Sequence, residues 1–182
     1  MNREPESQMT TPDPFKLYTA TLFDALGSRN PLEVMRGTPT ALRHAVSGLS
    51  PAQLAQREAP GKWSPAMVVQ HLADAELVGG FRFRMVLAQD SPTLPGYDQD
   101  AWADRMRYDL ADLEASLTTF SAIRAANLRL LERATPAELA RYMVHSERGN
   151  ESLEFMLRIY GGHDLIHLRQ ISRIRQAIGA RG

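Results

Sequence analysis

Three histidines are the residues of this chain whose type and spacing point most directly to chemistry. His163 and His167 are four positions apart, so on a helix they lie one turn apart on the same face. His71 is distant in sequence but lies in another segment with a helical pattern, from which it could face this pair. Three imidazoles with open coordination positions are typical of a catalytic metal site, whereas structural sites usually close with four protein ligands. The sequence therefore predicts a divalent-metal site formed by His71, His163 and His167.

A single histidine on an apolar helix face is usually a hydrogen-bonded core residue, but a pair one turn apart favours a shared partner. Two such imidazoles repel each other if charged and cost desolvation if unpaired. The run His163-Asp164-x-x-His167 also resembles the zinc-protease motif His-Glu-x-x-His, with aspartate in place of the glutamate base. We favour a protease less, because aspartate is one methylene shorter and no sheet edge is expected to hold a peptide. We expect His44 to lie among ordinary surface residues and His145 to order a turn.

The composition of the 182-residue chain limits the classes of function. Its 21 basic and 21 acidic residues give zero net charge, so the chain lacks the basic footprint of a nucleic-acid-binding protein. It contains no cysteine, which excludes disulfides, thiolate metal ligands and a cysteine nucleophile. No segment has the pattern of a signal peptide or a membrane span. We therefore expect a cytoplasmic protein with neither a nucleic acid nor a membrane as partner.

The pattern along the chain favours one helical domain. Residues 1–14 are polar and are expected to form a disordered arm, followed by a single domain over 15–182. Apolar periodicity and capping residues predict helices at about residues 15–26, 31–49, 51–56, 64–89, 110–133, 135–138 and 152–178. The apolar stripe of the last helix shares its face with His163 and His167, so the pair should point into the core. No stretch with strand periodicity competes, and the expected fold class is an all-α bundle of four main helices with short N-terminal additions.

Four motifs together resemble the DinB-like superfamily over about residues 31–178. They are Lys-Trp-Ser-Pro at 62–65, His-Leu-Ala-Asp-Ala-Glu at 71–76, Tyr-Asp-Gln-Asp-Ala-Trp at 97–102 and His-Asp-Leu-Ile-His-Leu-Arg-Gln-Ile at 163–171. The resemblance implies an up-down-down-up four-helix bundle, commonly a homodimer, with one metal held by three histidines. The matching positions are His71, His163 and His167. Metals bound in this superfamily include zinc and nickel, and some of its members are transferases that use bacillithiol or mycothiol.

These observations lead to two hypotheses about function. The first is a metal-dependent enzyme that transfers a small-molecule thiol to an electrophilic substrate, or hydrolyses a small molecule. In this scheme Asp74, one helical turn from His71, would orient that imidazole, and Tyr97, Asp98 and Trp102 would form part of the substrate rim. The second hypothesis is a non-catalytic binding or stress-response module in which the metal only holds two helices together. Open coordination positions beside a pocket would favour the enzyme.

Overall fold

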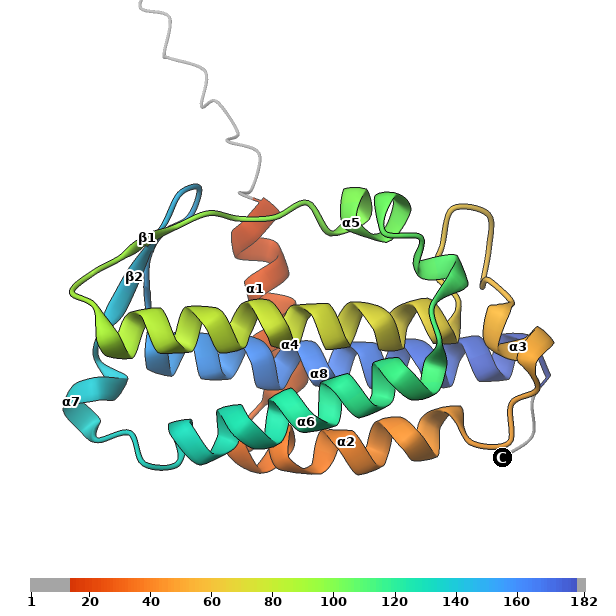
Figure 1. Cartoon of the computed structure of the whole chain (residues 1–182), viewed down its shortest axis with the longest axis horizontal. Helices are drawn as coiled ribbons and strands as arrows, with labels where there is room; N and C mark the ends of the chain where they lie inside the picture. The colour runs from red at the N-terminus through yellow and green to blue at the C-terminus, as the bar shows by residue number, and fades with distance from the viewer. Residues whose placement is uncertain (1–13, 180–182) are drawn as a thin grey trace, which may run out of the picture.

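Four long helices form a bundle in the computed structural model, which describes residues 14–179 (Figure 1). They are α2 (Pro31–Val46), α4 (Pro65–Ala88), α6 (Leu113–Leu131) and α8 (Leu153–Ala177). Each begins directly after a capping residue whose side chain accepts a backbone N–H of the first turn: Asn30, Ser64, Asp112 and Ser152, respectively. All but the last residue of the expected N-terminal arm lie outside the described residues. The predicted helical fold class is confirmed.

The paths of the connections give the order of helix directions (Figure 1). The link containing α3 (Pro51–Ala55) turns the chain back between α2 and α4, so these helices are antiparallel. A long crossing then carries the chain back to the end of the bundle at which α4 begins, so that α6 runs parallel to α4 (Figure 1). This crossing contains β1 (Thr93–Leu94), α5 (Gln99–Arg105) and the 3-10 helix η1 (Tyr108–Leu110). The topology is up-down-down-up, as the family resemblance implied.

A small sheet at one end of the bundle was not predicted from the sequence. In it β2 (Tyr142–His145) pairs with β1 in parallel and with β3 (Gly149–Ser152) in antiparallel orientation. Strands of two to four residues are too short to show a clear alternation. The predicted role of His145 is confirmed, because its Nδ1 accepts the Glu147 N–H of the β2–β3 turn at 3.2 Å. The short α7 (Pro136–Leu139) precedes this hairpin.

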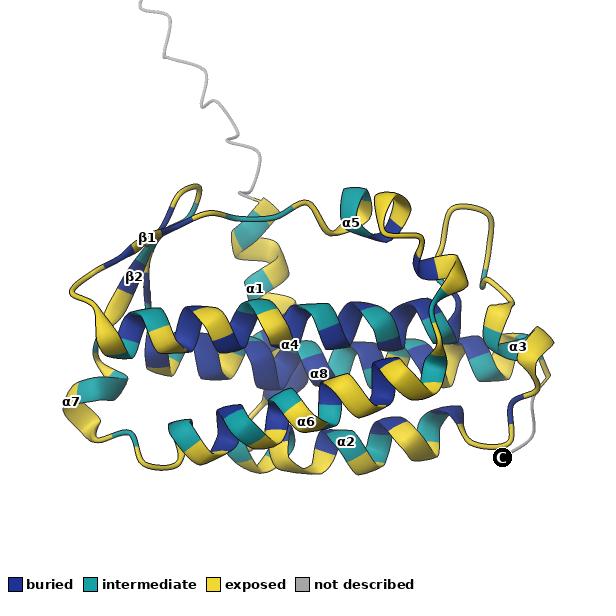
Figure 2. Cartoon of the chain, viewed as in Figure 1, coloured by how far each residue is buried: buried dark blue, intermediate teal, exposed yellow. Residues whose placement is uncertain are grey.

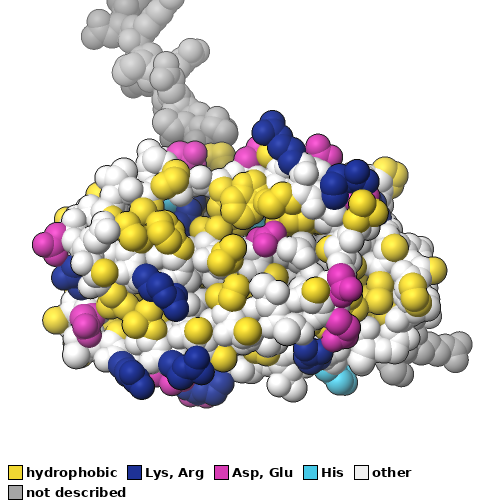
Figure 3. Space-filling model, viewed as in Figure 1, with side chains coloured by type: hydrophobic (Ala, Val, Ile, Leu, Met, Phe, Trp, Pro, Cys, Tyr) yellow, Lys and Arg dark blue, Asp and Glu magenta, His cyan; other side chains and the backbone are white. Residues whose placement is uncertain are grey.

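The buried interior, dark blue in Figure 2, consists of two apolar clusters separated by a polar layer. Along each bundle helix one cluster precedes the layer and the other follows it. The layer takes Thr38 from α2, Glu76 from α4, Arg124 and Asn127 from α6, and Asp164 from α8. No helix within residues 14–179 is long and apolar enough to cross a membrane. On the face shown in Figure 3, basic and acidic side chains are interspersed.

The first helix, α1 (Pro14–Leu26), packs against α8 of its own chain. This part of the N-terminal region therefore covers its own bundle, and the homodimer stays a prediction. The contact depends on Gly162, because a Cβ atom there would overlap the backbone of Leu22.

We expect Gly162→Ala to lower the free energy of unfolding by ~1–3 kcal/mol or more, which is the usual cost of overpacking. The clash is with the backbone of Leu22, which cannot move aside as a flexible side chain can. Chemical denaturation measures this change. Gly37→Ala is the matched control: Gly37 is an exposed position inside α2 with open space around it, so the same substitution should stabilise the protein by ~0.4–1 kcal/mol. Equal effects of the two substitutions would contradict a close contact between α1 and α8.

Candidate metal centre

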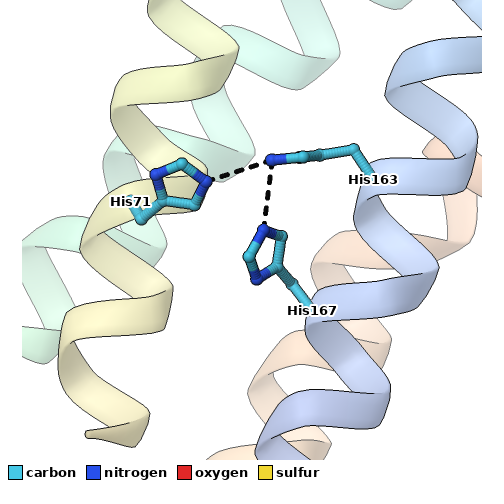
Figure 4. Close-up of side chains that lie close together, drawn as sticks. All are labelled: His71, His163 and His167. Atoms are coloured by element: carbon cyan, nitrogen blue, oxygen red, sulfur yellow. Dashed lines mark hydrogen bonds between the residues drawn. The ribbon is translucent and has the colours of Figure 1, made fainter. Parts of the chain in front are cut away.

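The three predicted ligands meet between α4 and α8. His71 projects from α4, and His163 and His167 project from successive turns of α8 toward it (Figure 4). The Nε2 atom of His163 lies 3.0 Å from Nε2 of His71 and 3.1 Å from Nε2 of His167. Nitrogen atoms that share one ion at bond lengths of ~2.1 Å are expected ~3.0–3.4 Å apart. The two separations from His163 therefore fit a single divalent cation, and the ligand atoms of all three histidines lie within 4.8 Å of one another.

The protonation state of the cluster also suits a metal. Burial, followed by the charge of His167, lowers the pKa of His71 to about 3. Burial also lowers the pKa of His163 and of His167 from the ordinary value. All three rings are thus neutral at pH 7, which is the form that binds metals. One imidazole nitrogen carries either one proton or one lone pair, so His163 Nε2 cannot form two good hydrogen bonds at once, whereas a cation would accept all three lone pairs.

Two residues that the sequence analysis did not assign to the site hold the imidazoles in place. The Nδ1 atom of His167 lies 2.8 Å from Oε1 of Gln170, one turn further along α8. The indole of Trp63 contacts two ligands, with its ring centre 4.7 Å from that of His71 and 6.4 Å from that of His167. Gln170 was detectable by its three-residue spacing from His167, whereas the position of Trp63 depends on the loop before α4.

Asp74 does not form the hydrogen bond that was predicted for it. Its Oδ2 accepts from the Tyr108 hydroxyl at 2.6 Å and from the Gln70 amide at 3.2 Å. The Nδ1 atom of His71 is buried and has no hydrogen-bond partner among the described residues. The three-residue step along α4 turns Asp74 toward the crossing segment, where η1 supplies the tyrosine. Asp74 therefore ties the crossing to α4 and does not orient His71.

Of the predicted rim residues, Tyr97 borders a cavity beside His163. Asp98 caps α5 by accepting the N–H groups of Asp100 and Ala101, both at 3.0 Å. Trp102 packs against the Tyr97 ring at 4.5 Å between centres. Asp98 and Trp102 thus position the crossing segment, while Tyr97 faces the candidate site.

Two cavities reach the histidines from different sides. A polar cavity of about 510 Å³ is bordered by Trp63, His167 and Gln170. A smaller one of about 170 Å³, with more apolar walls, is bordered by His163 and Tyr160. His71, His163 and His167 form a group of potential metal ligands, and among residues 14–179 no cysteine, further histidine or carboxylate belongs to that group. This arrangement would leave coordination positions open to molecules entering from the cavities.

Fold and site together define a four-helix-bundle protein with a tri-histidine cluster suited to one metal ion. The chain belongs to the DinB superfamily, whose family model matches residues 35–171. It is 30% identical to a Geobacillus kaustophilus protein, GK0616, over 94% of this chain and 99% of that protein. It is 27% identical to YfiT of Bacillus subtilis over 81% of this chain and 84% of YfiT. Both relatives are named as candidate metal-dependent hydrolases.

Solved structures show the same fold. The structure of Bacillus subtilis YfiT, described as an unusual four-helix-bundle topology, superposes with a TM-score of 0.78 and 24% identity, covering 100% of this chain and 94% of YfiT. TT2238, described as a four-helix bundle protein, matches with a TM-score of 0.57 and 23% identity over 79% of this chain and 96% of its own.

Proposed function

We propose that this protein is a metal-dependent enzyme that acts on a small molecule through one divalent cation held by His71, His163 and His167. The observation that carries the proposal is the convergence of three Nε2 atoms, with separations of 3.0 and 3.1 Å from His163. The names of the relatives support a hydrolase, in which water is the attacking group. The alternative reaction at the same site is the transfer of a small-molecule thiol to an electrophilic substrate. We propose zinc or nickel as the cation.

The residues around the cluster would prepare the site for this reaction. When bound, the cation would lower the pKa of a water in an open position to ~7, or deprotonate a thiol there. The three neutral imidazoles add no negative charge that would weaken this effect. Gln170 fixes the ring of His167, and the Trp63 indole lies beside the rings of His71 and His167. Since the chain has no cysteine, a reacting thiol would come from a cofactor such as bacillithiol or mycothiol.

The alternative is a non-catalytic module in which the metal only fastens α4 to α8. The two cavities that border His163 and His167 favour the enzyme, because a purely structural site is usually closed by a fourth ligand and has no access route.

The proposal is tested by assaying the metal-loaded protein against ester, amide and alkylating substrates, with and without added thiols. We expect turnover that disappears with a chelator and returns when zinc or nickel is added. Turnover in water alone identifies a hydrolase, and turnover that requires bacillithiol or mycothiol identifies a transferase. If every reaction runs no faster than with the metal-free protein, and a cobalt-substituted sample shows no change in its absorption spectrum with added thiol or azide, the module replaces the enzyme.

A further inference from the structure

The smaller cavity continues from His163 along the groove between α4 and α8. Ala75 borders it from α4, Met156 and Tyr160 border it from α8, and Leu22 borders it from α1. The walls are therefore mainly apolar and aromatic. His163, a candidate metal ligand, borders one end of the cavity. Arg82 also borders it and lies three turns of α4 beyond His71.

Arg82 is a buried cation without a counter-charge. Arg82 is 8% exposed, and its Nη2 donates a hydrogen bond to the Pro95 carbonyl at 2.7 Å. No carboxylate among residues 14–179 lies within ion-pair distance of it. Arg124, the other deeply buried arginine, instead meets Glu76 at 2.8 Å and Asp164 at 2.6 Å. A buried guanidinium normally has an anionic partner, because burying an unpaired charge is costly.

The charged side chains that border the cavity indicate which ligand charge would suit it. Arg148 also borders the cavity, but Glu151 neutralises it through two hydrogen bonds of 2.6 and 3.1 Å. With Arg82 added, the charged lining carries one net positive charge. A single monoanionic group would balance the charge of these side chains.

The Tyr160 ring forms a rigid wall next to Arg82. It lies directly on Gly79, where a Cβ atom would overlap the ring, and it packs against Phe83 at 5.0 Å between ring centres. Burial raises the pKa of Tyr160, whereas the charge of Arg82 and a hydrogen bond from its guanidinium to the Tyr160 oxygen act in the opposite direction, so the hydroxyl stays protonated. The Tyr160 oxygen accepts from Arg82 and its O–H remains a donor, so both residues can still donate to one anionic group beside them.

The position of Arg82 sets the length of the molecule that would fit. It follows His71 by eleven residues, or ~16 Å along the helix axis. The side chains of both residues lean toward the N-terminus of α4, and because the arginine side chain is the longer one, the guanidinium lies closer to the histidines than this axial rise. A short apolar chain or an aromatic ring with an acidic tail spans this distance.

We propose that Arg82 is an anion-binding residue and that this cavity takes a small carboxylate with an apolar or aromatic body, whose far end faces His163. The orientation toward the metal rests on the proposed function, whereas recognition of the carboxylate does not. This assigns a substrate class to the site.

The test compares 4-phenylbutyrate with its neutral isostere 4-phenylbutyramide by calorimetric titration of the metal-loaded protein. The acid should bind at least ~10-fold more tightly than the amide, because hydrogen bonds to a charged group are stronger than neutral ones. In Arg82→Gln this preference should fall to about one. Arg129→Gln is the matched control, since it removes the same charge from an exposed position on α6 and should keep the wild-type preference.

Three results would overturn the proposal. The first is equal binding of acid and amide by the wild type, which needs no variant and therefore does not depend on the folding of Arg82→Gln. The second is an unchanged preference in a folded, metal-loaded Arg82→Gln protein. The third is a preference that a chelator removes and Arg82→Gln retains, because the carboxylate would then bind only the metal. Failure to load metal at all would instead count against the proposed function, and the comparison of acid with amide can still be made on that protein.

Discussion

His71→Ala should lose tight binding of a divalent cation, with an affinity that falls by more than the ~10–100-fold cost of removing an outer partner of a ligand. The physical reason is that His71 is the ligand supplied by α4, and without it the cation would bridge only two nitrogens of one helix. His163→Ala should have an effect of the same size. Gln170→Ala should weaken binding by ~10–100-fold, since it removes the acceptor that orients the His167 ring. Titration against a chromogenic chelator measures all of these affinities.

Two histidines outside the cluster serve as controls. His44 is exposed on α2, and His145 is buried in β2, where it accepts a backbone hydrogen bond. Replacing either by alanine should leave the metal affinity unchanged, although His145→Ala should also lower stability. A His163→Ala/His167→Ala protein that still holds one ion per chain would show that the metal binds elsewhere.

The parts of the structure that could be predicted are those with local signals. Capping residues and apolar periodicity located the helices closely, as in the Ser64-Pro65 start of α4 and the Ser152 start of α8. The four-residue step from His163 to His167 is likewise a property of any helix. The pairing of His71 with them depended on family resemblance in addition to the helix, because sequence spacing alone does not determine which faces of two distant helices meet.

The parts that could not be predicted depend on contacts between distant segments. Asp74 was assigned to His71 from spacing, but Tyr108, 34 residues later, forms the shorter hydrogen bond with it. Asp164 directly follows a metal-ligand candidate in sequence, but its partner in the structure is Arg124, 40 residues earlier. Nothing near Arg82 in sequence indicates that its charge lacks a partner, since that follows only from the packing of α1, α4 and α8 around one cavity.

The polar layer beneath the metal centre carries the second large expected effect. Arg124 is 1% exposed, and its guanidinium donates to Glu76 at 2.8 Å and to Asp164 at 2.6 and 3.0 Å. Thr38 donates to the same Asp164 at 2.7 Å, and Asn127 donates to Glu76 at 2.8 Å. The guanidinium therefore pairs with two buried carboxylates that come from different helices.

Arg124→Leu should lower the free energy of unfolding by ~3–5 kcal/mol, the usual cost of breaking a buried ion pair from one side. Chemical denaturation at pH 7 measures this loss. Arg173→Gln is the control, because it removes an arginine from an exposed ion pair with Glu58 and should change stability little. Equal losses in the two variants would show that the layer contributes no more than a surface pair.

The pH dependence of Arg124→Leu separates lost charge compensation from lost packing. Burial already raises the pKa of Glu76, and Arg124 is the first opposing influence, so removing it should raise that pKa further. A group whose pKa is higher in the folded than in the unfolded protein stabilises the fold fully below its unfolded value of ~4.5, and this stabilisation is lost as the pH rises through the folded value. The deficit of Arg124→Leu relative to wild type should therefore be smallest near pH 4 and grow toward pH 8. A deficit that stays constant over this range would assign the loss to packing of the arginine side chain, and Glu76 and Asp164 would then not require its charge.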